Sequence, residues 1–351
     1  MEVVFRVDAS TEMGSGHVMR CLVLAEALRK RQAQVTFACL PLEGNLIELI
    51  QSKGFQVVTL PALDAQAAHQ GDSEYSKWLP HSQKQDAAFF LSEFSRFTTD
   101  WVVVDHYSLG CGWEGYIKEA LGCKILSVDD LNREHDSDLI LDQNLWRDME
   151  SRYSTSSARV LLGPEYALLR DSFSEYRNAG FKKKDQVIAF FGGSDISAEC
   201  KKLVEGFNKV KSLPFSVVVI AGRLNECYKQ IDEINLNPKV SVIRFAEDFD
   251  RMLAESRYVI GASGVSNWER FCLKVPASIV SVAENQRELS RYIAELGFVH
   301  FLGESEQTSS QTYVQEAHRL VSNWDSLVPF DDLDVDGYGA YRVVEELLDN
   351  C

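Results

Sequence analysis

The chain has 351 residues, 45% of them hydrophobic and 25% charged, and a formal net charge of -16 at pH 7. This apolar content excludes a disordered protein, and the length predicts about two domains. Acidic residues outnumber basic ones, 52 to 36, which argues against broad nucleic-acid binding because that requires basic patches. A phosphate-bearing small ligand stays compatible with the acidic balance if hydrogen-bond donors converge locally.

The first half of the chain alternates short apolar runs with segments of helical periodicity. Strands are expected at 3–7, 34–39, 55–60, 101–105, 124–128, 139–141 and 160–162, and helices at 17–28, 45–52, 86–97 and 114–121. Residues 61–85 are polar and weakly periodic, which predicts a long loop or an insertion. Alternation of strands and helices predicts a parallel sheet covered by helices on both faces.

A second unit of the same kind begins after the charged segment 182–185. Its expected strands are 187–191, 215–221, 240–245, 258–262 and 278–282, and its expected helices include 198–210, 268–273, 309–324 and 341–350. We therefore expect an α/β protein with two Rossmann-like parallel-sheet domains that face each other across a cleft. The expected division is an N-terminal α/β domain (1–165), a hinge (166–184), a C-terminal nucleotide-binding α/β domain (185–325) and a helical tail (326–351).

The eight cysteines are scattered and form no Cys-x-x-Cys pair, which favours free thiols in a reducing compartment. The first residues lack the basic region and apolar stretch of a signal peptide. No window approaches the ~18 apolar residues that a membrane-spanning helix needs. We expect a cytoplasmic protein that does not enter a membrane.

The loop after the first strand is the most informative segment for function. Gly14, Ser15 and Gly16 open a helix, where free backbone N–H groups and a positive local potential can hold an anion. Arg20 follows one helical turn later and can help with the same anionic group. His17 lies at the helix start, which disfavours the imidazolium form, so that a neutral ring can accept a proton from water. The alternative is a glycine-rich turn whose histidine has a structural role only.

Two further clusters follow predicted strands of the first half. Asp105 ends one strand and is a candidate to orient a histidine, while the neighbouring Tyr107 can stack on a sugar or hydrogen-bond to it. The segment 127–130 ends the next strand in two aspartates. Together with Asp8 and the histidines, these carboxylates suggest a metal site as an alternative. No short His-x-x-x-His or Cys/His spacing supports one. We expect no metal and no other cofactor.

In the second half, glycine-rich and small-residue turns follow the apolar strands. Gly193 belongs to a turn that can wrap a diphosphate with backbone donors, and a simple tight turn explains it equally well. A second turn opens a helix and carries a carboxylate that can accept from ribose hydroxyls, and a third offers an amide. The candidate nucleotide and sugar residues in these two turns are Ser263, Asn267, Glu269 and Asn285.

These motifs occur together in a recognisable order. Segments 5–10, 14–21, 105–107, 192–195, 268–270 and 285–286 follow one another as in the UDP-sugar hydrolase family of the pseudaminic acid pathway, which the sequence resembles over residues 1 to 300. The resemblance implies a GT-B-like fold and metal-independent hydrolysis of UDP-2,4-diacetamido-2,4,6-trideoxy-β-L-altropyranose, with inversion, to UDP and the free sugar. That sugar feeds a nonulosonic acid used to glycosylate flagellin or other surface structures. Relative to shorter members, the chain is longer near 61–85 and after residue 305.

The resemblance also assigns roles. His17 matches the catalytic histidine that activates water, Tyr107 and Asn285 match residues of the sugar pocket, and the segment 263–269 matches the part that holds the nucleotide. It leaves open whether Asn267 or Glu269 is the closer equivalent. The expected partner is a UDP-linked diacetamido sugar, with no nucleic acid and no membrane, for a chain that acts as a monomer. Three alternatives stay open: a GT-B glycosyltransferase, a hydrolysing UDP-sugar 2-epimerase, and a non-catalytic sugar-nucleotide-binding module.

Overall fold

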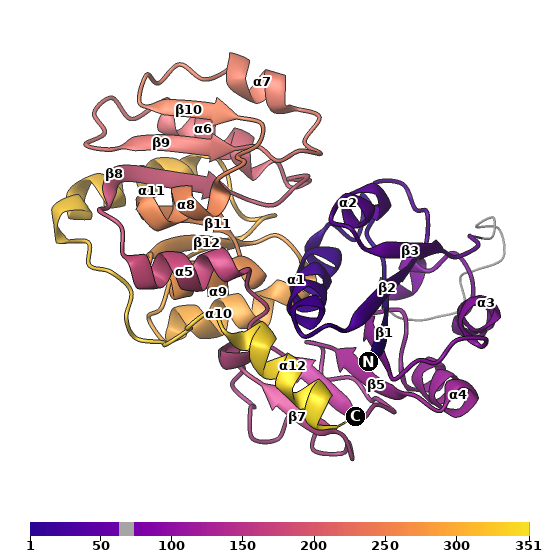
Figure 1. The fold of residues 1–351 in the computed structure, drawn as a ribbon. Helices are drawn as coiled ribbons and strands as arrows, with labels where there is room; N and C mark the ends of the chain where they lie inside the picture. The colour runs from indigo at the N-terminus through magenta and orange to yellow at the C-terminus, as the bar shows by residue number, and fades with distance from the viewer. Residues whose placement is uncertain (63–73, 351) are drawn as a thin grey trace. The chain divides into compact units, whose positions relative to one another are not determined.

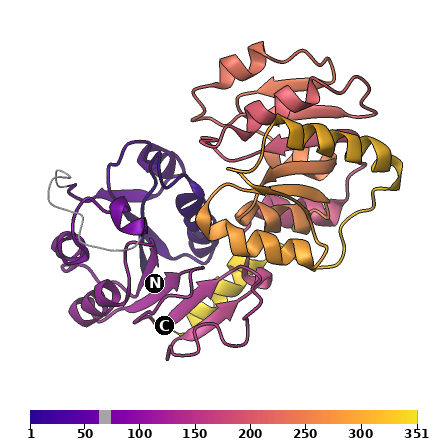
Figure 2. The same cartoon turned by 180° about the vertical axis from the view of Figure 1, so that it is seen from behind.

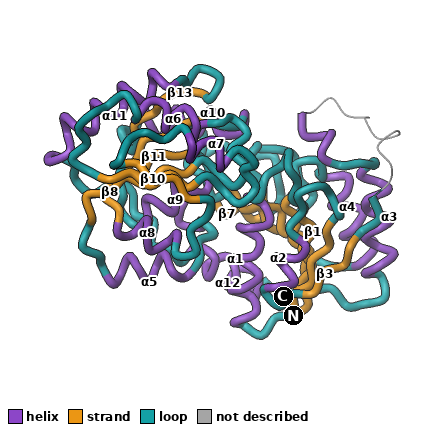
Figure 3. The backbone as a smooth tube through the Cα atoms, turned by 90° about the horizontal axis from the view of Figure 1, so that it is seen from above, coloured by secondary structure: helices purple, strands orange, loops and turns teal. Residues whose placement is uncertain are grey.

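The computed structural model describes residues 1–62 and 74–350, which divide into two compact units. Unit 1 contains residues 1–169 together with the C-terminal segment from Tyr338, and unit 2 contains residues 170–337. Each unit is built on its own parallel sheet flanked by helices, which Figure 3 shows as orange strands among purple helices. The expected α/β fold with two Rossmann-like sheets is confirmed.

The sheet of unit 1 has seven parallel strands in the order β3-β2-β1-β4-β5-β6-β7. The strands are β1 (Glu2–Val7), β2 (Gln34–Cys39), β3 (Gln56–Thr59), β4 (Trp101–Asp105), β5 (Lys124–Val128), β6 (Leu139–Asp142) and β7 (Arg159–Leu162). Most of their apolar side chains are buried because helices cover both faces, as is usual for a parallel sheet.

Helices lie on both faces of this sheet (Figure 1), and each face has its own hydrophobic core. One core packs α1 (Gly16–Lys30) and α2 (Ile47–Ser52) against the sheet, and the other packs α3 (Gln83–Phe94) and α4 (Cys111–Leu121). A 3-10 helix, η2 (Glu74–Trp78), precedes α3, and η3 (Pro164–Tyr166) follows β7. Within the expected insertion 61–85, residues 63–73 lie outside the described residues, while η2 and the start of α3 replace the expected loop.

The last helix, α12 (Gly339–Asp349), packs against α1 and completes the first core of unit 1. Its buried apolar side chains are Ala340, Val343, Val344 and Leu347. In Figure 1 it is the yellow helix beside α1 and β7. The division thus differs from the expected boundaries: the tail 326–351 does not form a separate part, and the expected hinge 166–184 contains a helix, α5 (Asp171–Ala179).

The sheet of unit 2 has six parallel strands in the order β10-β9-β8-β11-β12-β13. The strands are β8 (Lys184–Phe190), β9 (Ser216–Ile220), β10 (Val240–Ile243), β11 (Ser256–Ala262), β12 (Ala277–Ser281) and β13 (His300–Glu304). The helices are α6 (Glu199–Phe207), α7 (Tyr228–Glu233), α8 (Phe249–Glu255), α9 (Val265–Cys272), α10 (Arg287–Glu295) and α11 (Ser310–Asn323), with the 3-10 helices η4 (Glu284–Gln286) and η5 (Trp324–Ser326). Helices α6 and α11 pack together over one face, which is visible from behind in Figure 2.

Both sheets reverse their strand order at one internal point. In unit 1 the chain leaves β1 in one direction and returns on its other side at β4, and in unit 2 the same reversal separates β8 from β11. Ligands of open α/β sheets bind beyond the carboxyl ends of the strands at such a point. The loops after β1 and β4, and those after β8 and β11, are therefore the places to search for a site.

Candidate functional site

The strongest candidate site lies in unit 1, where His17 from α1 contacts Asp105 at the end of β4. Nδ1 of His17 lies 2.6 Å from Oδ1 of Asp105. The contact follows from topology, because β1 and β4 are adjacent strands and their carboxyl ends meet at the reversal point. A carboxylate accepting from Nδ1–H leaves Nε2 as the proton acceptor of the ring. The side chain of His17 is 9% exposed, whereas that of Asp105 is completely buried.

Arg20 completes this pair from the next turn of α1. Its Nε and Nη2 atoms each lie 2.6 Å from one oxygen of Asp105, a bidentate arrangement that fixes the carboxylate plane. Burial alone would raise the pKa of Asp105, but the charges of Arg20 and His17 and their hydrogen bonds hold it below the ordinary value. The carboxylate thus stays ionised. Arg20 was expected to contact an anionic ligand, and the structure engages two of its nitrogens with Asp105.

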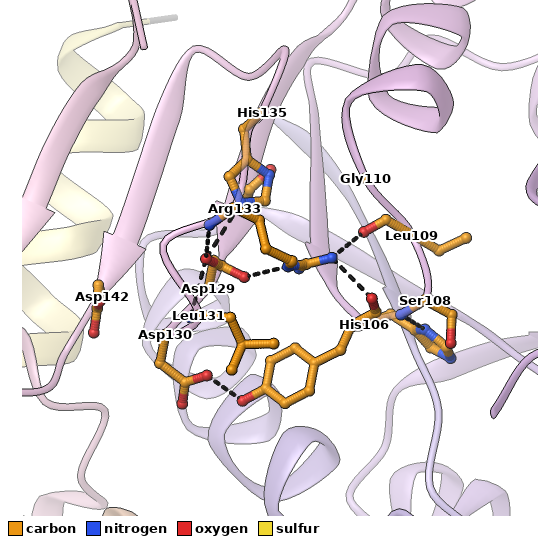
Figure 4. Close-up of polar contacts among 12 residues, drawn as sticks. His106, Ser108, Leu109, Gly110, Asp129, Asp130, Leu131, Arg133, His135 and Asp142 are labelled. Atoms are coloured by element: carbon orange, nitrogen blue, oxygen red, sulfur yellow. Dashed lines mark hydrogen bonds and ion pairs between the residues drawn. The ribbon is translucent and has the colours of Figure 1, made fainter. Parts of the chain in front are cut away.

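Tyr107 lies beside the same histidine, with ring centroids 4.7 Å apart and the rings nearly perpendicular. Its hydroxyl donates to Asp130, which lies two residues after the end of β5 (Figure 4). Burial and the charge of Asp130 raise the pKa of Tyr107 well above its ordinary value, so the phenol stays neutral and keeps its donor. Asp130 in turn accepts from Nδ2 of Asn144 at 3.3 Å and lies 3.7 Å from Nη1 of Arg20.

Arg133 ties together the loops that follow β4 and β5. It donates from Nε to Asp129 at 2.7 Å and from Nη1 to the carbonyl groups of Tyr107 and Leu109 at 2.9 and 2.7 Å (Figure 4). The position of Tyr107 is thereby set by its backbone as well as by its hydroxyl. Arg133 is not predictable from the sequence, since a lone arginine in a polar loop carries no recognisable pattern.

The turn that precedes α1 contains the backbone that we expect to hold an anion. Gly14 adopts a positive φ of 75°, and its N–H donates to the carbonyl group of Ser10. A Cβ added at Gly14 or at Gly16 would meet no atom within 4 Å, so the space beside this backbone is open. Ser15 is the N-cap residue and makes no side-chain capping bond, which leaves the first N–H groups of α1 available.

A buried network of charged side chains adjoins this turn through Asp8, and its contacts were not predicted from the sequence. Arg6 on β1 contacts Asp8 at 2.8 Å and Asp86 of α3 at 2.7 Å. His106 lies 3.3 Å from the same Asp8, and burial lowers the pKa of this histidine. Asp8 also accepts from the N–H group of Leu40 at 2.6 Å. These contacts fix the carboxyl ends of three neighbouring strands, so Asp8 and His106 have a structural role.

Among the described residues, no group of three or more His, Cys, Asp and Glu side chains is arranged to hold a metal ion. Within the same part of the chain, no helix has the length and apolar character needed to cross a membrane.

In unit 2 the corresponding reversal point carries the candidate turns after β8 and β11. Gly193 follows β8, and its carbonyl group accepts from the N–H of Leu224 at 2.9 Å. Next to it, Gly222 has a φ of 101°, and a Cβ there would lie 2.2 Å from the carbonyl oxygen of Gly193. Asp195 closes the turn by accepting from two N–H groups at the start of α6, Glu199 and Cys200, at 2.9 and 3.0 Å.

The turn between β11 and α9 is fixed by its own side chains. Asn267 donates from Nδ2 to Oγ of Ser263 at 3.0 Å, and Arg270 donates from Nη2 to Oδ1 of Asn267 and to the carbonyl group of Ala262. Asn267 is therefore buried in a structural bond network. Glu269 lies 3.7 Å from Arg170, and burial raises its pKa.

The remaining candidate, Asn285, lies in η4 after β12 and is half-buried. Next to it, Gln286 accepts from the N–H group of Val282 at 3.0 Å and approaches Gly264 of the neighbouring turn. The structure thus gathers the predicted residues into two groups. His17, Arg20 and Tyr107 meet with the Gly14–Gly16 turn in unit 1, and Gly193, Ser263, Asn267, Glu269 and Asn285 follow neighbouring strands in unit 2.

Comparisons with known proteins bear on the resemblance and on the fold. The chain is 27% identical over 303 residues to the UDP-2,4-diacetamido-2,4,6-trideoxy-beta-L-altropyranose hydrolase of Campylobacter jejuni, covering 85% of this chain and 98% of that protein. The resemblance inferred from the motifs is confirmed. The chain is also 24% identical to the spore coat polysaccharide biosynthesis protein SpsG of Bacillus subtilis, over 99% of this chain and 98% of that protein. No family model matches the sequence.

Among solved structures, MurG of Acinetobacter baumannii resembles the chain with a TM-score of 0.68 over 99% of both chains, at 14% identity. At this identity the likeness concerns the fold alone. Together with the two parallel sheets, it confirms the expected GT-B-like fold.

Proposed function

We propose that the protein is a UDP-sugar hydrolase. Its substrate would be UDP-2,4-diacetamido-2,4,6-trideoxy-β-L-altropyranose, and its products UDP and the free sugar used to build pseudaminic acid. The observation that carries the proposal is the 2.6 Å contact between Asp105 and His17 beside open glycine backbone at the reversal point of the sheet. The substrate comes from the name of the Campylobacter jejuni relative.

In the proposed reaction His17 is the general base. Asp105 accepts from Nδ1–H, and Nε2 takes a proton from water. The water oxygen forms a bond to the anomeric carbon while the bond from that carbon to the phosphate oxygen breaks, and its electron pair stays on UDP. Attack from the face opposite the leaving group inverts the anomeric configuration. No metal ion is needed in this scheme, because the leaving diphosphate is already anionic and fixed donors can stabilise its developing charge.

For binding we propose two sets of contacts. The N–H groups of Ser15 and Gly16, beside the open backbone of Gly14, suit the diphosphate, and Tyr107 suits the sugar. In unit 2, the uridine diphosphate would be held by Gly193, Ser263 and Glu269, and Asn285 would contact the sugar. Since Asn267 is engaged with Ser263 and Arg270, Glu269 is the better candidate for the ribose hydroxyls.

The test is proton NMR of the purified protein with the UDP-diacetamido sugar in the presence of EDTA. We expect free sugar of inverted anomeric configuration and UDP to appear together without an acceptor. A transferase would require an acceptor, an epimerase would change the configuration at C2, and a binding module would release no UDP. The variant His17→Asn should lower kcat by at least about 10²–10⁴-fold and still bind UDP. Near-normal turnover in that variant would remove His17 from the mechanism.

A further inference from the structure

Three aromatic side chains line the site beside His17, and two of them come from the segment between β3 and α3. Tyr75 and Trp78 belong to η2, and Tyr107 follows β4. The rings of Trp78 and Tyr107 are stacked, with centroids 5.6 Å apart and an interplanar angle of 23°. Tyr75 lies 4.9 Å from Trp78 and 5.0 Å from Tyr107. We refer to Tyr75, Trp78 and Tyr107 as the aromatic wall.

The aromatic wall contacts the proposed general base directly. The His17 ring lies edge-on to Trp78 with centroids 5.9 Å apart and edge-on to Tyr107 at 4.7 Å. A ligand atom that reaches Nε2 of His17 must therefore pass close to an aromatic surface.

Contacts on both sides of η2 hold the wall in place. Ser108, which follows Tyr107, donates from Oγ to the carbonyl group of Tyr75. After η2, Leu79 is buried, and His81 lies 3.2 Å from Asp86 in the charged network beneath the site. The segment is thus joined to the loop after β4 and to the start of α3. A wall fixed in this way can discriminate between ligands because it does not move aside at low cost.

The exposure of the Tyr75 and Trp78 rings distinguishes them from the aromatic residues of the core and favours a role in binding. Tyr75 and Trp78 are half-buried, whereas Trp101 and Trp113, which belong to the cores of unit 1, are at most 1% exposed. An aromatic ring that is stacked on one side and partly open to solvent offers an apolar surface to a ligand. Aromatic surfaces of this kind bind methyl groups and apolar sugar faces and give little to a hydroxyl group.

We infer that Trp78 and Tyr75 are specificity-determining residues for the sugar, an inference that rests on the proposed function. They would select a sugar rich in methyl groups, namely one with acetamido groups and a deoxygenated C6, over a sugar with a C6 hydroxyl. Burying a hydroxyl group against the wall without a partner would weaken binding, whereas a methyl group in the same place would strengthen it. This assigns a role to part of the segment 61–85, for which the sequence predicts only a long loop or an insertion.

The first test measures binding without turnover. In a His17→Asn background, isothermal titration calorimetry would compare chains with and without Trp78→Ala, using UDP-2,4-diacetamido-2,4,6-trideoxy-β-L-altropyranose and UDP alone. We expect the Kd for the UDP-sugar to rise at least about tenfold and the Kd for UDP to stay within about twofold. Trp78→Phe keeps an aromatic ring and should restore most of the affinity. Phe97→Ala is the matched control, since Phe97 is an aromatic residue of unit 1 that is 69% exposed.

The second test measures selectivity by turnover. For the protein with His17 intact, we expect Trp78→Ala to lower kcat/KM for the diacetamido-trideoxy substrate relative to UDP-GlcNAc by about tenfold or more. Unchanged Kd and selectivity in Trp78→Ala would overturn the inference while leaving the proposed function standing. Failure of the unaltered protein to hydrolyse any UDP-sugar would instead overturn the proposed function. Should Trp78→Ala lower Tm severely, Trp78→Gln fills part of the same volume with a polar side chain, and unchanged selectivity in that variant counts equally against the inference.

Discussion

Oδ1 of Asp105 lies 2.6 Å from Nδ1 of His17, although the two residues are 88 positions apart in the chain. Their meeting follows from the strand order, because β4 pairs directly with β1 and Val7 is in register with Asp105. The same carboxylate accepts two bonds from Arg20. Asp105 therefore sets both the tautomer of the histidine and the position of the neighbouring cation.

Replacing Asp105 with asparagine should reduce turnover strongly. The amide cannot act as an anionic acceptor for both His17 and Arg20, so His17 loses the partner that keeps Nε2 free. We expect kcat for hydrolysis of the UDP-diacetamido sugar to fall by about 10²–10⁴-fold, with the Kd for UDP unchanged. Asp100→Asn is the control, because Asp100 is a half-exposed carboxylate of the same unit. A folded Asp105→Asn protein with ordinary kcat would contradict the proposed role.

Tyr107 should act together with Asp130, the acceptor of its hydroxyl. Removing that hydroxyl in Tyr107→Phe leaves Asp130 with fewer donors, and we expect kcat/KM to fall by roughly tenfold. Because both changes break one hydrogen bond, the double variant Tyr107→Phe with Asp130→Asn should lose less than the product of the single losses. Tyr116→Phe, at a tyrosine that is 49% exposed, should change nothing. Strictly multiplicative losses would show that the two residues act separately.

Gly222 should be the least replaceable of the glycines near the unit 2 turn. A Cβ there would lie 2.2 Å from the carbonyl oxygen of Gly193, at a φ of 101° that L residues rarely adopt. Gly297→Ala is a matched control, since its φ is also positive at 79° but the added Cβ meets no atom within 4 Å. We expect Gly297→Ala to lower the free energy of unfolding by about 1–2 kcal/mol, and Gly222→Ala by roughly another 1–3 kcal/mol.

The Gly222→Ala variant should also bind UDP more weakly, because the clash displaces the Gly193 turn that we propose for the nucleotide. Urea denaturation and UDP titration of both variants provide the measurement. Equal losses of stability in the two variants would mean that the turn yields easily to the added methyl group.

Sequence periodicity predicted the sheets well and the junctions between elements less well. Buried parallel strands are nearly continuous apolar runs, so β1, β2, β4 and β5 coincide with the expected segments. Helix α5 was missed because the polar run around Asp171 resembles a linker, and its apolar contacts are few. The pairing of α12 with α1 is a tertiary contact over 300 positions, and local sequence carries no signal for it.

For the candidate site, the sequence predicts His17 and Arg20 at the start of the helix after the first strand, and Asp105 and Tyr107 at the end of a later strand. It did not identify Trp78, which lies in a polar stretch without periodicity. A tyrosine and a tryptophan three positions apart in such a stretch were the available signal, since polar loops rarely carry two large aromatic residues without a packing reason. Arg6 and Asp86 lie 80 positions apart, and only the fold brings them together.

Leu347 tests whether α12 belongs to the fold of unit 1. Its side chain is completely buried in the core that α12 shares with α1. We expect Leu347→Ala to lower the free energy of unfolding by about 2–5 kcal/mol, whereas Leu236→Ala, at a leucine that is 82% exposed, should change it by less than about 0.5 kcal/mol. Hydrogen exchange should accelerate in β1–β7 and stay unchanged in β8–β13. Faster exchange in unit 2 strands alone would contradict the assignment of α12 to unit 1.

His135 should make stability depend on pH in a defined window. Nδ1 of His135 lies 2.7 Å from Glu114, and Nε2 lies 3.5 Å from Asp129. Burial alone would lower the pKa of His135, but these two carboxylates raise it from 6.5 to about 9. A pKa that is higher in the folded state means that the folded protein binds the proton more tightly than the unfolded chain does. The stabilisation is therefore complete below pH 6.5 and is lost as the pH rises to about 9.

The variant His135→Gln removes this titration, so the difference in unfolding free energy between the unaltered protein and the variant should shrink across that window. We expect a decrease of up to about 3 kcal/mol, from urea denaturation at pH 6 and at pH 9.5. Comparing the two proteins cancels the other groups that titrate in the same range. His318→Gln is the matched control, because His318 is an exposed histidine whose removal should leave the difference constant. The difference in unfolding free energy between the unaltered protein and His135→Gln could also be equally large at both pH values. That result would show that the ring does not carry a proton between Glu114 and Asp129.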